Sequence, residues 1–470
     1  MTTAQPKRIG YNTSYMSLDK KAILLITLAF LARVINLNQS LWLDETTTAN
    51  VVMRYGYLDI ITKFSPHDFH PPLYYLFVKF WTNIFGYSEI ALRMPSVMAS
   101  MLTGYVIYKL AEGKKLGKSL AFWAAAFFLF NPLVVYYSQE ARMYAIVTLL
   151  VTLIFWSVTK LHFGSAQGKL VTSYKFKGRQ IILANIFIAL SLATFYGSIF
   201  FIASLYLYLV LKKEFKLLTY LLPGTVLAST ILSPLFIVQL KNSGEVLKAI
   251  PNWSLTLGKA NLKNLFLIPI KLTSGRISFE PKWLYYGISG VWVAYIGYWL
   301  AQLGLQTKKY DQYFFYLKMP VFLGFAISFY KPLLQYFRFI YILPFFSMLL
   351  AVAIYKSWHR YLMVGGFIVF SLIYLLGPSF HREDWKSLVA DLPSNHVCSL
   401  PSSFDPLHYY NSKLITSDAR SCTTSKGDVI VVPYAEEIYG FDTTAYMKQK
   451  KYILSKEVSF RGVEYQIWKR

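Results

Sequence analysis

Residues 37–50 read LNQSLWLDETTTAN and come directly after an apolar run. The stretch places two adjacent carboxylates, Asp44 and Glu45, behind a tryptophan, in a chain with only 23 acidic residues among 470. One explanation is a helix start, because acidic side chains are stabilised at the positive end of the helix dipole. Whether the pair does more depends on the surroundings that the rest of the chain creates.

The composition is that of a membrane protein. Hydrophobic residues make up 55% of the chain and charged residues only 15%, with a mean hydropathy of +0.39. Soluble domains carry about a quarter charged residues. The net charge of +25 is distributed in short clusters between apolar runs, which is typical of cytoplasmic loops rather than of a nucleic-acid surface. We therefore expect an all-α polytopic membrane protein with no nucleic-acid partner.

Apolar runs that could cross the bilayer, which takes about 20 residues per helix, occur about eleven times. They are 22–37, 90–111, 118–136, 142–160, 180–195, 197–211, 216–239, 283–303, 318–330, 333–353 and 361–378. If all of them cross, the basic clusters of the intervening connections share one side, which the positive-inside rule makes cytoplasmic. This predicts a multi-pass protein of the cell (inner or plasma) membrane, with its N-terminus inside and its C-terminus outside.

The opposite, extracytoplasmic side then receives an outer loop at 38–89, a long connection at 240–282 and everything after Gly377. The apolar stretch 71–85 is expected to lie in the outer interface, because a crossing there would turn every later basic cluster outward. Residues 1–378 thus form the predicted transmembrane domain, whose outer loop carries the active site.

Residues 379–470 are expected to form a small α/β domain outside the membrane. The stretch 385–392 has the apolar spacing of a helix, and GDVIVVPY and KKYILSKEVSF have the composition of strands. Cys398 and Cys422 both fall in this region. A disulfide and two buried free thiols are both compatible with the sequence.

Several polar groups share the predicted outer face with Asp44 and Glu45. Four stretches carry them: HDFHPPLYY at 67–75, YYSQEARMY at 136–144, YKPLLQYFRFIYILP at 330–344 and HRED at 381–384. Carboxylates can take a proton from a hydroxyl, while Arg, Lys and His can hold a phosphate. The combination suits displacement of a phosphate leaving group by an alcohol. Helix capping, and for Arg338 an extension to the interface, are the structural alternatives.

The order of these motifs resembles that in bacterial glycosyltransferases of the GT-C fold, in the group related to protein mannosyltransferases and lipid A aminoarabinose transferase. The resemblance rests on WLDE at 42–45, HPPLYY at 70–75, SEIALRMPS at 88–96, YSQEARMY at 137–144, FRFIYILP at 337–344 and REDW at 382–385. The stretch 160–330 matches only in its hydropathy.

The resemblance implies an inverting transferase that moves a sugar from a polyprenyl-phosphate donor to a hydroxyl of a lipid, glycan or protein acceptor. Asp44 matches the catalytic base of the family, and Glu45 would support it or bind acceptor or a divalent metal. The donor phosphate would be held by Arg338, Lys331, Arg142 and His70. A second acidic or acceptor site would comprise Glu140, His67 and Asp68. At His70 the sequence departs from a lysine found in some relatives, so a titratable cation replaces a permanent one.

Other functions remain as alternatives. A transporter or lipid flippase would place ionisable groups near the bilayer midplane, whereas these acids cluster outside the spans. A glycan polymerase or ligase would use the same class of donor, and a non-enzymatic assembly subunit would need none of the acids. The sequence contains no HExxH motif and no P-loop, which argues against a metalloprotease and a nucleotide-dependent kinase.

Overall fold

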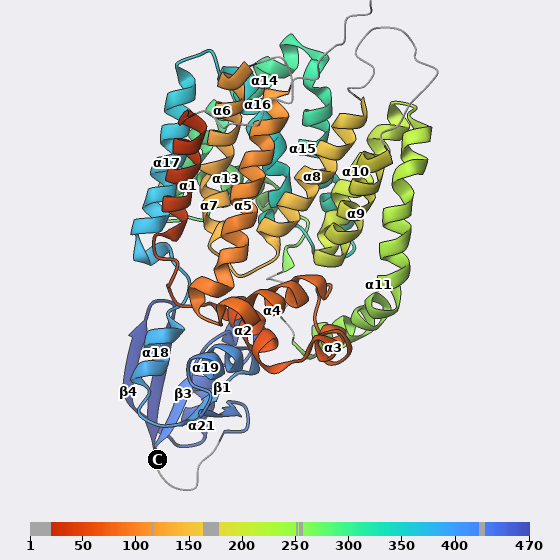
Figure 1. Ribbon diagram of the computed structural model, residues 1–470. Coiled ribbons are helices and arrows are strands. Elements are labelled where there is room, and N and C mark those ends of the chain that lie inside the picture. The colour runs from red at the N-terminus through yellow and green to blue at the C-terminus, as the bar shows by residue number, and fades with distance from the viewer. Residues whose placement is uncertain (1–19, 114–116, 163–177, 251, 253–256, 423–427) are drawn as a thin grey trace, which may run out of the picture.

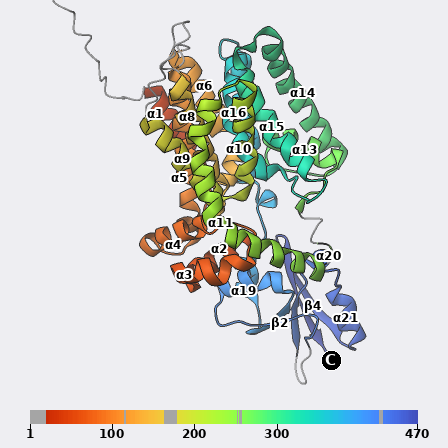
Figure 2. The same ribbon diagram turned by 90° about the vertical axis from the view of Figure 1, so that its right-hand side faces the viewer.

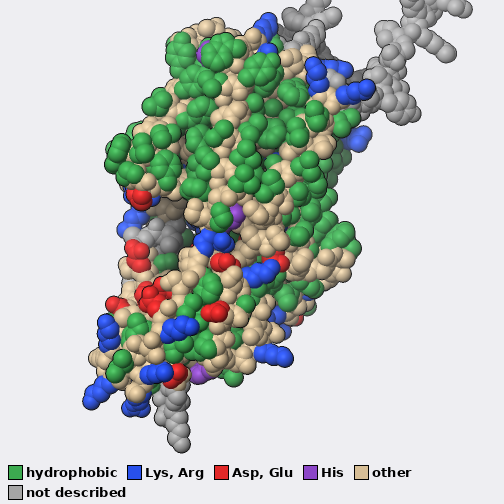
Figure 3. Space-filling view, turned by 90° about the vertical axis from the view of Figure 1, so that its left-hand side faces the viewer, with side chains coloured by type: hydrophobic (Ala, Val, Ile, Leu, Met, Phe, Trp, Pro, Cys, Tyr) green, Lys and Arg blue, Asp and Glu red, His purple; other side chains and the backbone are tan. Residues whose placement is uncertain are grey.

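The computed structural model describes residues 20–113, 117–162, 178–250, 252, 257–422 and 428–470. It consists of a tall helical bundle and a smaller sheet-containing part at one end of the bundle (Figure 1). Helix α1 begins at the far end of the bundle and runs toward the smaller part. Apolar side chains cover the visible face of the bundle, while charged side chains gather on the smaller part (Figure 3).

The bundle is built from helices that the apolar runs predict. Its helices are α1 (Lys20–Val34), α5 (Glu89–Glu112), α6 (Gly117–Leu129), α7 (Pro132–Ser138), α8 (Tyr144–His162), α9 (Gly178–Thr194), α10 (Ile199–Leu211), α11 (Phe215–Ala249), α13 (Leu262–Ser274), α14 (Lys282–Gln306), α15 (Asp311–Ile327), α16 (Leu343–Ile354) and α17 (His359–Leu376). Short turns precede α10 (η4, Tyr196–Ser198), α15 (η5, Lys308–Tyr310) and α16 (η6, Tyr336–Ile342). The expected all-α bundle is confirmed.

The described residues contain fewer helices of membrane-crossing length than the number of spans expected from the sequence. Within the described residues, six helices are long and apolar enough to cross a membrane, or up to seven if the bent pair α6–α7 is one span. The pair bends by 60°. The bend has a local cause, because the Asn131 side chain accepts hydrogen bonds from the N–H groups of Leu133 and Val134 and Pro132 begins the new helix. The remaining predicted spans coincide with the shorter apolar helices α1, α9, α10 and α15.

The segment between α1 and α5 lies across the end of the bundle (Figure 1). It comprises α2 (Leu43–Arg54), α3 (Tyr57–Asp59), the turns η1 (Ile60–Phe64) and η2 (Ser65–His67), and α4 (Leu73–Phe85). In α4, Tyr74, Tyr75 and Val78 are buried, while Phe80 and Ile84 are exposed. This amphipathic helix runs across the bundle end rather than through it, as expected for residues 71–85.

The stretch 240–282 contains the end of one helix and a further short helix. Helix α11 continues to Ala249 and bends beneath the bundle toward the sheet-containing part (Figure 2). Pro234 lies inside this helix, where it removes a backbone hydrogen bond. Helix α13 then packs against α7 and α14. The sequence did not predict α13, because it has only 13 residues and no span-length apolar run marks it.

The smaller part, here called the C-terminal domain (Trp385–Lys469), contains a five-stranded mixed sheet of order β2-β1-β3-β5-β4. A short turn, η7 (Pro378–Phe380), precedes it. Strand β1 pairs in parallel with β2 and β3, and β5 pairs antiparallel with β3 and β4. The elements are α18 (Trp385–Asp391), β1 (His396–Ser399), η8 (Pro401–Ser403), α19 (Phe404–Tyr410), β2 (Ile415–Asp418), β3 (Val429–Val432), α20 (Glu436–Tyr439), α21 (Thr443–Gln449), β4 (Ile453–Phe460) and β5 (Val463–Lys469).

Sequence patterning predicted the core of this domain. Trp385, Leu388 and Val389 of α18 are buried in it, as their helical spacing indicates, and β3 and β4 occupy the two predicted strand segments. Cys398 and Cys422 form a disulfide, with their Cα atoms 6.1 Å apart. The sequence was compatible with a disulfide and with two free thiols, and the structure contains the disulfide.

Candidate active site

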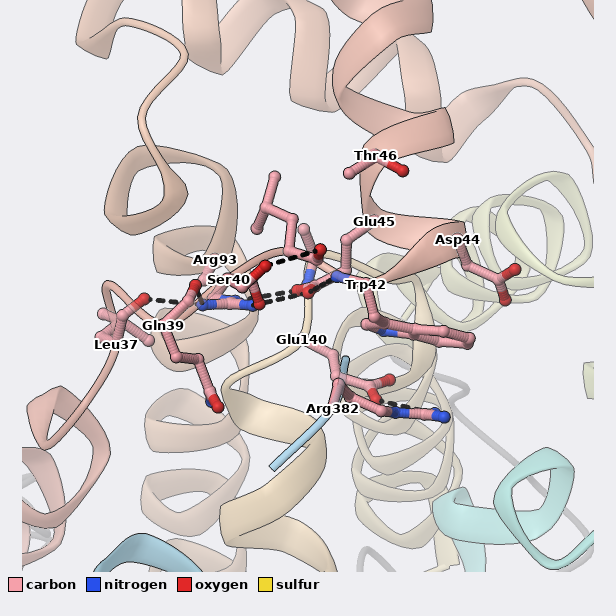
Figure 4. A network of polar contacts seen from close by, with 12 residues as sticks. Leu37, Gln39, Ser40, Trp42, Asp44, Glu45, Thr46, Arg93, Glu140 and Arg382 are labelled. Carbon is pink, nitrogen blue, oxygen red and sulfur yellow. Dashed lines mark hydrogen bonds and ion pairs between the residues drawn. The ribbon is translucent and has the colours of Figure 1, made fainter. Parts of the chain in front are cut away.

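Glu45 is the centre of a buried network at the start of α2 (Figure 4). Its carboxylate accepts two hydrogen bonds from Arg93 of α5, at 2.9 and 2.6 Å, and one from the backbone N–H of Ala141 at 2.7 Å. The backbone N–H of Trp42 donates a fourth at 3.3 Å, so Glu45 also caps its own helix. Arg93 donates further to the carbonyls of Leu37, Gln39 and Ser40. The network joins α2, α5 and the loop after α7.

This arrangement corrects the expectation that Glu45 contacts acceptor or metal. The Glu45 side chain is fully buried, and both of its oxygens are already hydrogen-bonded. A buried Arg–carboxylate pair with this bidentate geometry orders the chain around it. Glu45 therefore holds the start of α2 in place, which is the supporting role that the sequence also allowed.

Asp44 points away from Glu45 (Figure 4) and has different surroundings. Its side chain is 41% exposed, and its Oδ2 lies 3.6 Å from Nη2 of Arg142. Arg142 is buried and also donates to the backbone carbonyl of Asp44 at 3.4 Å. Asp44 is thus a partly accessible carboxylate beside a buried cation, in a position where it can reach a ligand.

The loop between α7 and α8 brings Glu140 and Arg142 to this place. Its Gln139 donates to the carbonyls of Arg33 and Ile35 at the end of α1, at 2.9 and 2.7 Å. Glu140 is buried, and its Oε1 lies 3.3 Å from Nη2 of Arg382 and 3.9 Å from Nη1 of Arg276. The expected second acidic position is therefore paired with two arginines.

Arg276 and Arg382 come from distant parts of the chain and converge on Tyr136. Both guanidinium groups donate to the Tyr136 hydroxyl. The Arg382 guanidinium also stacks on the ring of Trp42, 3.6 Å from its centroid. Arg276 follows Gly275, which has a φ of +73° and lies so close to Pro132 that an added Cβ would be 2.8 Å from the proline Cβ. Glycine at this turn thus lets Arg276 approach the start of α7.

Polar atoms around this cluster lack hydrogen-bond partners among the described residues. They are Nε1 of Trp42, Oε2 of Glu140 and Nε of Arg142, each fully shielded from solvent. Buried polar groups in native proteins are normally hydrogen-bonded. These three atoms belong to the same polar cluster as Asp44, whose internal hydrogen bonding is therefore incomplete within the described residues.

Burial, together with the neighbouring Glu45, raises the pKa of Glu140 to about 8, although Arg276 opposes the shift. The Glu140 carboxyl group therefore titrates near neutral pH. Asp68, in contrast, has a lowered pKa, because the attraction of His70 and Arg142 outweighs the effect of burial. Glu140 and Asp68 consequently differ in their ease of protonation.

Three further predicted site residues, His67, Asp68 and His70, lie just before α4. Asp68 accepts a hydrogen bond from the Tyr75 hydroxyl at 2.8 Å and lies 3.4 Å from Nδ1 of His70. The backbone of this turn is held by Gln239 of α11, which donates to the carbonyl of His70 at 3.0 Å. His67, at the end of the η2 turn, is exposed.

Arg338 and Lys331, which the resemblance also assigned to the donor phosphate, differ from each other in burial. Arg338 is half-buried in η6, and its Nη1 donates to the carbonyl of Leu257 at 3.2 Å. Lys331 is exposed on the connection between α15 and η6. Neither residue has a described hydrogen bond or ion pair to the carboxylates of the Asp44 and Glu140 cluster.

Comparison with known proteins supports the fold. The sequence profile described as dolichyl-phosphate-mannose-protein mannosyltransferase matches residues 69–238, which include α4, α5 and the Glu140 loop. ArnT from Cupriavidus metallidurans in the apo state is similar in structure, with a TM-score of 0.62 at 10% identity, over 95% of this chain and 97% of that chain. The chain therefore has the GT-C fold, and residues 69–238 are similar to the mannosyltransferase profile.

Two further structures share this GT-C fold. ArnT from Cupriavidus metallidurans bound to undecaprenyl phosphate has a TM-score of 0.59 at 11% identity, over 95% of this chain and 97% of that chain. The archaeal oligosaccharyltransferase AglB from Archaeoglobus fulgidus, in complex with an inhibitory peptide and a dolichol-phosphate, has a TM-score of 0.51 at 11% identity, over 94% and 74% of the two chains. No curated protein sequence matches the chain. The expected GT-C fold is confirmed.

Sequence reasoning missed the roles of three arginines in this GT-C protein. Arg93 and Arg382 lie in motifs that carry the family resemblance, SEIALRMPS and REDW, so a buried or converging role could have been suspected there. Arg276 lies in the stretch that matched only by hydropathy. Its one signal is an isolated cation after Gly275 at the end of an apolar run, which by itself does not distinguish a site residue from an interface anchor.

A metal site is not favoured by the groups that are present. Within the described residues, no group of three or more His, Cys, Asp and Glu side chains is arranged to hold a metal ion. The carboxylate of Glu45, which the resemblance allowed to bind a divalent metal, is paired with Arg93. The arrangement instead offers one accessible carboxylate beside several guanidinium groups, which suits an anionic ligand.

Proposed function

We propose that this chain transfers a sugar from a polyprenyl-phosphate donor to an acceptor hydroxyl, by a single displacement that inverts the anomeric carbon. The observation that supports this most strongly is the convergence of Arg142, Arg276 and Arg382, from three separate segments, on one carboxylate-containing cluster at the end of an apolar bundle. Guanidinium groups bind phosphate oxygens through charge-assisted, often bidentate hydrogen bonds. The related fold of ArnT with undecaprenyl phosphate bound supports a lipid phosphate as the anion.

Asp44 is the proposed general base. In an inverting displacement the acceptor oxygen attacks the anomeric carbon from the face opposite the leaving group, and the base takes the acceptor's proton. The bond between the anomeric carbon and the phosphate oxygen breaks, and the phosphate leaves with the bonding electrons. Asp44 meets the requirement for access, since 41% of its side chain is exposed.

The arginines supply the complementary part of the chemistry. Negative charge develops on the leaving phosphate in the transition state, and fixed cations stabilise it because they need little reorganisation. Arg276 and Arg382 are held in place by Tyr136 and Glu140, and Arg382 also by Trp42. Hydrogen bonds to Tyr136 and Glu140 thus hold both guanidinium groups at the site before a phosphate arrives.

We further propose that the site lies on the extracytoplasmic side of a cell membrane, where lipid-linked rather than nucleotide-linked sugars are available. Helix α2, which carries Asp44, and the C-terminal domain lie at the same end of the bundle (Figure 1), and the predicted basic connections would lie at the other. A transporter has less support, because its ionisable groups would lie within the bundle rather than at its end.

The phosphate-binding part of the proposal can be tested with undecaprenyl phosphate as the probe, by native mass spectrometry of the purified protein in detergent. Arg276→Gln and Arg382→Gln should each weaken binding by about tenfold or more, since hydrogen bonds to a charged group contribute about 1.5–3 kcal/mol. Arg420→Gln is the control, because Arg420 pairs with Asp418 on the surface of the C-terminal domain. Unchanged affinity in both folded site variants would contradict a phosphate site at this cluster.

A further inference from the structure

The C-terminal domain holds the helix that carries Asp44. Asp405 of α19 accepts a hydrogen bond from the hydroxyl of Thr47 at 2.6 Å and one from the side-chain amide of Asn50 at 3.0 Å. The same Asn50 amide donates to the backbone carbonyl of Asp405 at 2.9 Å. Asn50 is buried by this contact, with an exposure of 4%. A single residue of α19 thus binds two successive turns of α2.

Neighbouring contacts fasten the approach to α2 in the same way. The backbone N–H of Leu41 donates to the Tyr410 hydroxyl at 2.7 Å, and the Ser40 hydroxyl accepts from the backbone N–H of Lys386 at 3.2 Å. Lys386 also pairs with Glu89 at the start of α5, with a distance of 3.0 Å. The chain from Ser40 to Asn50 is therefore attached to the C-terminal domain along its length.

Helical geometry places Asp44 between two attachments. Successive residues of an α-helix are rotated by about 100°. Relative to Asp44, Glu45 lies about 100° in one direction, whereas Thr47 and Asn50 lie about 60° and 120° in the other. Glu45 is held by Arg93 of the bundle, and Thr47 and Asn50 are held by Asp405. Any rotation of α2 about its axis would break one of the two sets of bonds.

We propose that Asp405 is a positioning residue, through which the C-terminal domain sets the rotation of α2 and hence the direction of the Asp44 carboxylate. This inference rests on the proposed function, in which Asp44 is the base. A base must lie within hydrogen-bond reach of the acceptor hydroxyl, and a misplacement of about 1 Å can lower the rate about 100-fold. The C-terminal domain then contributes to the chemistry without touching the reacting atoms.

The paired variants Asn50→Asp and Asp405→Asn test this contact specifically. Asn50→Asp alone places a carboxylate against the Asp405 carboxylate and carbonyl, so it should loosen α2. The double variant Asn50→Asp with Asp405→Asn reverses the donor and the acceptor and should restore much of the bond. Asp405→Ala removes the side-chain acceptor altogether. The matched control is Asp418→Ala, which removes a carboxylate of the same domain that pairs with Arg420 and has no described contact with α2.

Three measurements on the full-length protein apply to each variant. Hydrogen exchange followed by mass spectrometry reports how well the backbone amides of residues 41–50 are protected. Mass analysis of envelope glycolipids and glycoproteins, from cells whose own copy of the gene is deleted, reports the transferred sugar. Native mass spectrometry with undecaprenyl phosphate reports the donor-phosphate site.

Asp405→Ala and Asn50→Asp should speed exchange in 41–50 and lower the product about tenfold or more, with undecaprenyl phosphate affinity retained. The double variant should recover both exchange and product, and Asp418→Ala should change neither. Unchanged exchange in Asp405→Ala, or faster exchange with normal product, would overturn the positioning role. If wild-type cells show no product at all, the proposed function fails, and the exchange data still decide whether Asp405 holds α2.

Discussion

Asp44 and Glu45 are neighbours in the chain, yet their side chains serve different purposes. Glu45 is fully buried against Arg93. Asp44 is partly exposed, and among the described residues Arg142 is the cation within ion-pair distance of its carboxylate. Glu45→Ala would leave the Arg93 guanidinium buried without its counter-charge, which costs about 3–5 kcal/mol. We expect this variant to lose thermal stability in detergent.

The control for Glu45→Ala is Glu112→Ala. Glu112 pairs with Lys109 at 2.8 Å at the edge of α5, with 32% of its side chain exposed. Such a partly exposed pair contributes about 1 kcal/mol or less. A Glu45→Ala protein that unfolds at the wild-type temperature but no longer transfers sugar would show that Glu45 contacts a substrate after all.

Glu140 should make stability depend on pH in a recognisable direction. Burial raises its pKa to about 8, above the value of about 4.3 for an unfolded chain. The folded state then binds more protons than the unfolded state between these values, so the stability contributed by the protonated group is full below about pH 4 and is lost as the pH rises toward 8. In Glu140→Gln this loss is absent.

The corresponding measurement is the melting temperature of wild type and Glu140→Gln between pH 5 and 9. The difference, variant minus wild type, should become more positive as the pH rises. A difference that stays constant over this range would show that Glu140 is ionised throughout, paired fully with Arg276 and Arg382.

At the residue scale, sequence patterns do not show which of two adjacent acids is buried. The acidic pair, the Glu140–Arg142 motif and the HRED stretch were recognisable, because acids are rare in this chain and the motifs follow the family order. Which of two adjacent acids is buried depends on Arg93, which lies 48 positions away from Glu45. Arg276 could not be assigned at all, since only the folded chain brings it to Tyr136.

At the scale of elements, hydropathy predicts the helices well and their ends less well. A helix occurs at each predicted span, because a run of apolar residues in the bilayer must satisfy its own backbone hydrogen bonds. The break between α6 and α7 is a local capping effect at Asn131, and hydropathy does not register it. Helix α13 was missed because short helices packed against other helices need no long apolar run.

The direction of these helices gives a testable topology. The connection between α5 and α6 carries basic residues, while β4 belongs to the C-terminal domain at the other end of the bundle. We expect Lys118→Cys to be labelled by an impermeant thiol reagent only after the cells are opened, and Ser459→Cys to be labelled in intact cells. The native cysteines are joined in a disulfide and should not react. Labelling of position 118 in intact cells would reverse the proposed orientation.

At the scale of the whole molecule, the site belongs neither to the bundle nor to the C-terminal domain alone. Arg276 and the Glu140 loop come from the bundle, Arg382 comes from the approach to the C-terminal domain, and Asp44 lies on a helix bonded to both parts. The class of fold followed from composition and motif order, because those properties are spread along the chain. The joint between the two parts did not, because it depends on hydrogen bonds between residues more than 300 positions apart.

The central claim is that Asp44 acts as the base in transfer of a sugar from a lipid phosphate. Its most direct test is mass analysis of envelope glycolipids and glycoproteins from gene-deleted cells that express wild type, Asp44→Asn or the control Asp59→Asn, whose carboxylate pairs with Lys63 on the surface. Asp44→Asn keeps the shape and removes the base, so the transferred sugar should fall by about 10²–10⁴-fold while Asp59→Asn retains it. Asparagine serves a helix start about as well as aspartate does, so near-normal product from Asp44→Asn would contradict the account and reduce the carboxylate to a helix-terminal charge.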